Sequence, residues 1–187
     1  IYPYTYNNSP YILAIVGTVY PQLVSLFNIT GGLIATQNIS DLMQNLTSQG
    51  YSLDNIFIYE YNNTAYISIS LSSSSDYLLY EMTVNGDNIS YPQLVSAVYG
   101  FDALYGYPFF AKVANYTIFG GIFRNTSSGQ IRTLLNITQN NTTVISVDSG
   151  YSYRFRPMRF GYIPWTIETK DYVYLVFVTG KSTDSNL

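Results

Sequence analysis

The chain has 187 residues and a formal net charge of −3, and only 10% of its residues are charged. This length suits one domain with a sizeable core, and an acidic balance without a basic tail argues against a nucleic-acid partner. The absence of cysteine and histidine excludes a disulfide framework and removes the commonest metal ligand and general base. The 21 tyrosines and 10 phenylalanines favour strands, so the composition predicts a mainly β fold.

The first forty residues contain no Asp, Glu, Lys or Arg. At the start of this stretch Tyr2, Tyr4 and Tyr6 alternate with other residues, so they share one face of an extended segment. Asn7 opens a glycosylation sequon on the opposite face, where a glycan must point outward, and this predicts that the tyrosine face is buried. Residues 11–20 are apolar on both faces. They form a membrane anchor, a strand of their own domain, or a strand donated to another molecule.

A membrane helix is the least favoured of these three readings. The apolar segment over residues 11–27 is shorter than the roughly 20 apolar residues that a span needs. It also contains Gly17 and Pro21. Pro3, Pro10 and Pro21 lack a backbone N–H, which suits an edge strand or an inserted strand.

Further along the chain, short elements alternate with turn residues. Apolar residues follow helical spacing after Pro21 (Leu23, Leu26, Phe27) and after Pro92 (Leu94, Val95, Val98, Tyr99), which predicts two short helices. A third helix is predicted over 40–49, with Ser40 as its cap. Asn62-Asn63, Asn85-Gly86 and Gly120-Gly121 are predicted turns. Strands are predicted over 55–61, 64–71, 77–84, 109–119, 122–124, 131–137, 142–147, 151–156 and 172–178.

Asparagine is the most informative residue type in this sequence. Eleven of the 16 Asn residues open an N-x-Ser/Thr sequon, whereas chance placement would give roughly three. These eleven predicted glycosylation sites are Asn7, Asn28, Asn38, Asn45, Asn62, Asn88, Asn115, Asn125, Asn136, Asn140 and Asn141. The pattern predicts an extracellular, heavily N-glycosylated surface protein with Ile1 as a processed mature N-terminus. The alternative is a polar, turn-rich chain with accidental sequons.

The low charge also suits an acidic environment. Carboxylates that are not used in ion pairs lose little when they are protonated, so stability would depend weakly on pH. Life in hot acid is therefore a hypothesis from composition.

No catalytic constellation is visible in the sequence. The carboxylates fall at no catalytic spacing, and a serine nucleophile would have only Lys112, Lys170 or Lys181 as its base. Arg154, Arg156 and Arg159 alternate with aromatic residues, which is typical of an ordinary strand as well as of a nucleic-acid groove. We expect no enzyme activity, catalytic residue, metal site or cofactor.

A cysteine-free, sequon-dense chain rich in Tyr, Asn, Ser and Thr, with an uncharged apolar N-terminus, resembles the surface thread subunit of thermoacidophilic archaea. The resemblance implies a pilus-like filament of Ig-like or pilin-like β-sandwich subunits. Residues 1–20 would form a donor-strand tail and residues 21–187 the sandwich head. The chain's partner would be itself, in a head-to-tail homopolymer. The subunit-binding residues would be Tyr2, Tyr4, Tyr6, Tyr11, Leu13, Ile15 and Val19.

Two other functions remain open at this stage. The chain could be a monomeric, glycosylated cell-surface or S-layer-associated binding domain, with residues 11–20 as its own first strand. It could also be a secreted, acid-tolerant hydrolase. For the filament, the hinge of the donated segment lies at Pro10 or at Pro21. We favour donation that extends past Pro10.

Overall fold

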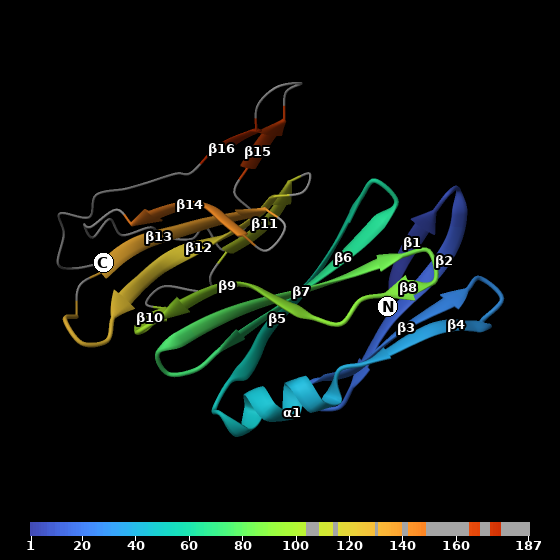
Figure 1. The fold of residues 1–187 in the computed structure, drawn as a ribbon, viewed down its shortest axis with the longest axis horizontal. Helices are drawn as coiled ribbons and strands as arrows, with labels where there is room; N and C mark the ends of the chain where they lie inside the picture. The colour runs from blue at the N-terminus through green and yellow to red at the C-terminus, as the bar shows by residue number, and fades with distance from the viewer. Residues whose placement is uncertain are drawn as a thin grey trace, which may run out of the picture. The chain divides into compact units, whose positions relative to one another are not determined.

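The computed structural model describes residues 1–103, 109–113, 116–129, 131–139, 142–148, 165–168 and 173–176. These residues form a mainly β structure of antiparallel sheets with one short helix (Figure 1). The chain divides into two compact units, which are described separately. The first unit contains Ile1–Ser74 and Leu78–Leu94, and the second contains Ser75–Tyr77 and Val95–Leu187. The predicted mainly β class is confirmed.

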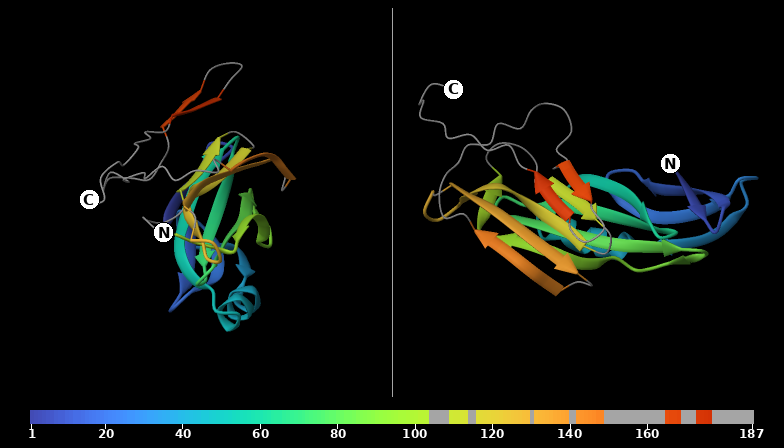
Figure 2. Two further views of the ribbon diagram at one scale, coloured as in Figure 1. Left: turned by 90° about the vertical axis from the view of Figure 1, so that its left-hand side faces the viewer. Right: turned by 90° about the horizontal axis from the view of Figure 1, so that it is seen from above.

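Residues 2–38 form one antiparallel sheet, called here the first sheet. Its strands pair in chain order, so each is joined to the next by a hairpin (Figure 2, blue). Leu13, Val24 and Leu26 are fully buried on it. Residues 1–20, the predicted tail, thus lie in the first unit. The strands are β1 (Tyr2–Tyr6), β2 (Ser9–Gly17), β3 (Pro21–Asn28) and β4 (Leu33–Asn38).

The helix α1 (Ser40–Ser48) follows the first sheet and confirms the helix predicted over 40–49. Met43 and Leu46 form its buried face. The predicted cap is wrong: the Ser40 side chain makes no capping bond, and instead its N–H donates to Asn38 Oδ1 at 2.8 Å. Asn38 takes over the role because a short amide side chain just before a helix can accept from an unpaired first-turn N–H.

A second sheet completes the first unit. Ala65, Ile67, Ile69 and Leu71 are buried along one strand. Ser68 and Ser70 between them are buried as well, whereas the alternation of apolar residues with serine predicts that the serine face is exposed to solvent. The turn at Asn62-Asn63 is confirmed, since both residues have the positive φ of a tight hairpin (48° and 59°). The strands join in the order β5 (Ser52–Tyr61), β6 (Thr64–Ser72), β7 (Asp76–Asn85) and β8 (Asn88–Ile89).

The second unit is built on β12, a ten-residue strand whose Ile118, Phe119 and Phe123 are buried. The Phe123 ring lies edge-on to Tyr77, with ring centroids 5.2 Å apart. The sheet order is β10-β12-β13-β14, β11 also pairs with β12, and β15 pairs with β16. The elements here are β9 (Gln93–Tyr99, which begins in the first unit), β10 (Phe101–Ala103), β11 (Phe109–Val113), β12 (Tyr116–Asn125), β13 (Ile131–Gln139), β14 (Thr142–Asp148), β15 (Trp165–Glu168) and β16 (Val173–Val176).

The helices predicted after Pro21 and Pro92 are wrong, because β3 and β9 occupy these positions. The same apolar residues can fit the spacing of a helix and the alternation of a strand. Pairing within the sheet determines which of the two forms. Val24 and Leu26 are buried two residues apart, and β3 pairs with strands on both sides. In this case tertiary burial outweighs the helical pattern.

Other predicted elements of the second unit differ in their limits. Gly120 and Gly121 do not form a turn, because both pair with β13 in the middle of β12. The strand predicted over 109–119 is split between β11 and β12. The strand predicted over 151–156 lies outside the described residues, and the one over 172–178 is described as β16. Among the described residues, no helix is long and apolar enough to cross a membrane.

Replacing Ile67 tests the core of the first unit. Ile67→Ala leaves a cavity at a fully buried position and should lower the free energy of unfolding by about 2–5 kcal/mol. Ile29→Ala, at a position that is exposed, should change it by less than about 0.5 kcal/mol. Urea denaturation followed by circular dichroism measures both. Equal effects of the two substitutions would contradict this description of the core.

Candidate functional site

β1 is an edge strand of the first sheet and pairs only with β2, from Tyr2 opposite Leu13 to Tyr6 opposite Ser9. Tyr4 is 1% exposed and Tyr2 and Tyr6 are half-buried, whereas Pro3 and Thr5 are exposed. The predicted burial of the tyrosine face is therefore confirmed.

The hydroxyl of Tyr4 anchors β1 to the second sheet. It lies 2.6 Å from the carbonyl oxygen of Asn63 and 3.1 Å from that of Val84, and its single proton is shared between these acceptors. Asn63 and Val84 are 59 and 80 residues away in the sequence. The Gly86 backbone lies beside this hydroxyl. We call the group formed by the Asn63 and Val84 carbonyls and Gly86 the Tyr4 seat.

The chemistry of the Tyr4 seat is neutral. Burial raises the pKa of the Tyr4 phenol, and the nearby Gly86 backbone opposes this shift. Because the pKa is raised, the hydroxyl stays protonated and keeps its proton for the two carbonyls. The Tyr11 ring packs beside that of Tyr4 at a centroid distance of 6.0 Å. Because the contacts at the Tyr4 seat involve neutral groups, the stability of this attachment depends little on ionic strength.

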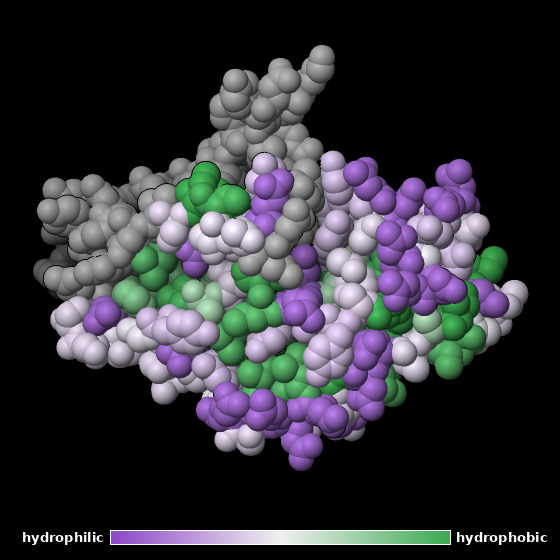
Figure 3. Space-filling model, viewed as in Figure 1, coloured by the Kyte–Doolittle hydropathy of each residue, from purple (hydrophilic) through white to green (hydrophobic). Residues whose placement is uncertain are grey.

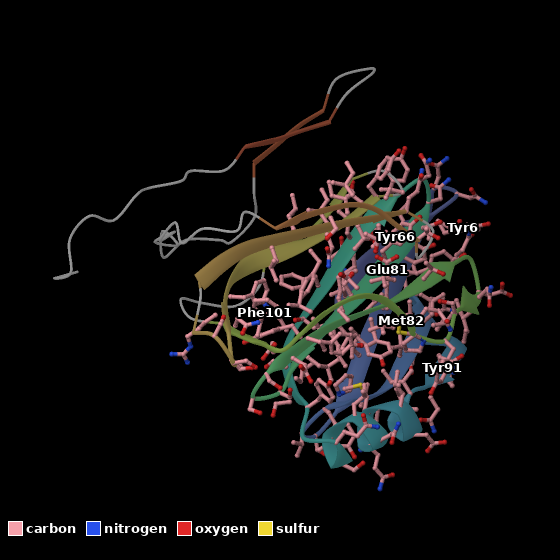
Figure 4. The ribbon with its side chains drawn as sticks, turned by 60° about the vertical axis from the view of Figure 1, so that its left-hand side comes forward. Tyr6, Tyr66, Glu81, Met82, Tyr91 and Phe101 are labelled. Atoms are coloured by element: carbon pink, nitrogen blue, oxygen red, sulfur yellow. The ribbon has the colours of Figure 1, made fainter. Side chains whose placement is uncertain are left out.

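Gly86 shapes the end of the seat, where Tyr6 lies (Figure 4). Its φ of +63° belongs to the left-handed region, and a Cβ built on it would lie 3.3 Å from two carbons of the Tyr6 ring. A side chain at this position would therefore be strained by the backbone and would also push against Tyr6. Glycine allows the β7–β8 turn to approach the β1 side chains.

Glu60 of β5 provides a third contact along β1. Its carboxylate accepts a hydrogen bond from the Thr5 backbone, which lowers its pKa, but desolvation by burial is the larger effect and raises the pKa overall. Burial also raises the pKa of the Tyr2 phenol, and the nearby Glu60 charge adds to that rise. Contacts at three consecutive residues, Tyr4, Thr5 and Tyr6, thus join β1 to the second sheet.

Two matching asparagine turns lie beside the seat. Asn7-Asn8 joins β1 to β2 with φ angles of 47° and 62°, and Asn62-Asn63 joins β5 to β6 with similar angles. Asn63 Nδ2 donates to Asn7 Oδ1 at 3.3 Å, which connects the two turns. Asn tolerates this left-handed conformation better than most residues do.

The other residues predicted to bind a subunit lie in different surroundings. Leu13 is fully buried in the first sheet, and Tyr11 and Ile15 are half-buried on the same strand. Val19 lies in the β2–β3 connection and is 82% exposed. The structure thus brings the tyrosines together at the seat and leaves Val19 apart from them.

Sequence reasoning missed the residues that accept Tyr4. Asn63 and Val84 act through main-chain carbonyls, which every residue has, so nothing in the sequence marks them. Gly86 was recognised only as a turn residue. Its role beside Tyr6 follows from the fold, not from the local pattern.

A separate feature of the first sheet is the apolar end of the β3–β4 hairpin. Ile29, Leu33 and Ile34 are exposed there, and apolar atoms gather over this hairpin on the face shown in Figure 3. Asn28 holds the turn, since its Oδ1 accepts from the Thr30 N–H, the Thr30 hydroxyl and the Gly32 N–H. This apolar end is exposed, whereas the Tyr4 seat is filled.

Eight of the predicted glycosylation sites lie among the described residues. Exposed positions are Asn7, Asn38, Asn45, Asn62 and Asn88, and half-buried positions are Asn28, Asn125 and Asn136. Asn115, Asn140 and Asn141 lie outside the described residues. The five exposed residues are the ones at which an attached glycan would find the most space.

The carboxylates of the described residues do not form a metal site. No three of the Asp and Glu residues described in the structure group as ligands. Asp54 is half-buried, accepts a 2.6 Å hydrogen bond from Ser72 Oγ, and has a buried Oδ2 without a hydrogen-bond partner. Burial raises the pKa of Asp54, and the Ser72 hydrogen bond opposes the rise. A protonated Asp54 fits these surroundings better than a charged one.

Comparisons with known proteins identify no relative. No protein-family model, curated protein sequence or solved structure matches this chain.

Tyr4→Phe tests the seat directly. The substitution keeps the ring but removes the proton shared by the partly buried carbonyl of Asn63 and the buried carbonyl of Val84, so it should lower the free energy of unfolding by about 1–3 kcal/mol. Tyr91→Phe, at an exposed tyrosine, should have almost no effect. Thermal and urea unfolding of both variants provide the measurement. A Tyr4→Phe variant as stable as the parent would mean that the seat is not an anchor.

Stability should rise as the solution becomes acidic. The folded-state pKa values of Asp54 and Glu60 are raised, so both groups bind protons more tightly in the folded chain. Their contribution is fully present below the unfolded pKa and is lost as the pH rises through the folded pKa. Melting temperatures should therefore be higher at pH 3 than at pH 7, and Asp54→Asn should reduce the difference. A steep loss of folding towards pH 3 would contradict this expectation.

Proposed function

We propose that this chain is the structural subunit of an extracellular, heavily N-glycosylated, pilus-like filament. In this proposal the subunits are pilin-like β-sandwiches that polymerise head to tail, each donating its N-terminal strand to the next. The carrying observation is the way β1 is held: an uncharged edge strand whose buried Tyr4 binds two main-chain carbonyls remote in sequence. Such contacts are those of an inserted strand, in which backbone groups supply affinity and buried side chains supply specificity.

The sequons support an extracellular location. Five of them are exposed on strands, turns and the helix of the first unit, so glycans would cover much of its surface and oppose broad lateral association. When glycans cover the surface, a strand inserted into a neighbour can still connect two subunits, because this contact needs little free surface. A head-to-tail contact of this kind does not close on itself and can extend a filament.

A second candidate is a monomeric, glycosylated surface domain. It is favoured by the pairing of β1, β2 and β3 within one chain, which gives residues 1–20 a place in their own sheet. The two candidates differ in what happens when β1 is removed. A filament subunit loses its means of assembly, whereas a monomeric domain loses only one edge strand.

Deleting residues 1–7 distinguishes the two candidates. Negative-stain microscopy should show fibres one subunit wide for the full chain and none for the truncated chain. The truncated chain should remain folded by circular dichroism, because β2 and β3 keep their pairing. It should also bind an added peptide of residues 1–8. Tyr91→Ala, at an exposed position, serves as the control and should still form fibres. Fibres from the truncated chain would contradict the proposal.

A further inference from the structure

We propose that the acceptor of the donated strand is the Tyr4 seat of the next copy, and that β1 alone is exchanged about the Asn7-Asn8 turn. This inference rests on the proposed function and names its binding site and hinge. The seat already fits β1 within one chain. A second copy of β1 presents the same atoms, so it can make the same contacts when it replaces the first.

The pairing pattern shows why β1 rather than the whole β1–β2 hairpin is the exchanged element. β2 pairs with strands on both sides, and its Leu13 is fully buried, so its removal would open the first sheet. β1 has one neighbour and five paired residues. Its Pro3 lacks an N–H, as suits a strand that lies at an edge. Separating β1 from β2 between Tyr6 and Ser9 therefore disrupts the first sheet least.

The Asn7-Asn8 turn can act as the hinge. Both residues occupy the left-handed region in the hairpin, with φ angles of 47° and 62°, and both return to ordinary extended backbone when the turn opens. Residues 2–17 would then form one continuous extended segment of about 53 Å. This segment is long enough to carry β1 away from its own sheet while β2 stays in place.

The seat also selects its occupant. The two carbonyls require a hydroxyl donor that is buried on the strand, which Tyr4 supplies. Gly86 leaves space for a second aromatic ring two residues further on, which Tyr6 fills. Glu60 accepts from the backbone N–H between them, at Thr5. The seat therefore recognises an uncharged strand with tyrosines at alternate positions, and the N-terminal strand of another copy matches this description.

Because the chain contains no cysteine, a pair of introduced cysteines can report whose strand fills the seat. The full chain carries Thr5→Cys on β1 and Asn62→Cys, at an exposed position of the β5–β6 turn next to Asn63. It is treated with a short bis-maleimide crosslinker after fibre assembly and examined on a denaturing gel. The control pair is Thr5→Cys with Asp41→Cys. Asp41 is exposed on α1, which follows the opposite end of the first sheet from Thr5.

A ladder of crosslinked dimers, trimers and larger species is the expected result for the Thr5/Asn62 pair, and the control pair should give none. Gly86→Val, which blocks the seat, should abolish the ladder. Gly31→Val, with a similar φ of +86° but no atom within 4 Å, should retain it. These two variants separate occlusion of the seat from backbone strain.

The remaining outcomes assign failure to one proposal or the other. Fibres that contain only intramolecular crosslinks would overturn the inference and leave the proposed function standing. Crosslinked dimers without larger species would support exchange at the seat but would contradict an open filament, since two copies would then exchange strands reciprocally. A chain that forms no fibres and only intramolecular crosslinks would overturn both.

Discussion

The position of the N-terminal strand depends on one hydroxyl group. Tyr4 donates to the carbonyl of Asn63 in the β5–β6 turn and to that of Val84 in β7, and so contacts segments that are 59 and 80 residues away. Around it, Thr5 binds Glu60 and Tyr6 packs against Gly86. Since buried carbonyls without a donor are costly, the hydroxyl stabilises the seat as much as the strand. The neutral character of all these groups except Glu60 agrees with a chain that has few charges.

The sequence predicted more of the fold than of the site. The alternation of Ile67, Ile69 and Leu71 with serine identified β6, and paired asparagines identified the turn at Asn62-Asn63, because these signals arise from local geometry. The prediction for β3 was wrong, because Leu23, Leu26 and Phe27 follow helical spacing and the pairing of β3 on both sides cannot be read from the sequence. The parity of Tyr2, Tyr4 and Tyr6 predicted the buried face. The acceptors could not be predicted, because main-chain carbonyls carry no sequence signature and become a site only when remote strands meet.

The surroundings of Asp54 and Glu60 favour the neutral form of the carboxyl group, in agreement with the low charge content of the chain. Asp54 has one carboxyl oxygen bound to Ser72 and the other buried without a partner, so its neutral form is the one its surroundings suit. Glu60, beside β1, shows the same direction of shift. In many proteins acid removes stabilising carboxylate pairs, whereas here these two carboxyl groups favour the folded chain when they are protonated. Glu60, which lies along β1 beside the seat, is thus one of the two groups expected to respond to acid.

The use of main-chain acceptors has a consequence for how such a protein can change over time. A seat made of the carbonyls of Asn63 and Val84 does not depend on the side chains of those residues, as long as the two strands keep their places. Substitutions over the second sheet can therefore accumulate while the seat stays the same, with Gly86 as the position of least freedom. Two chains that differ widely in their outward surfaces would therefore still hold β1 through the same main-chain contacts.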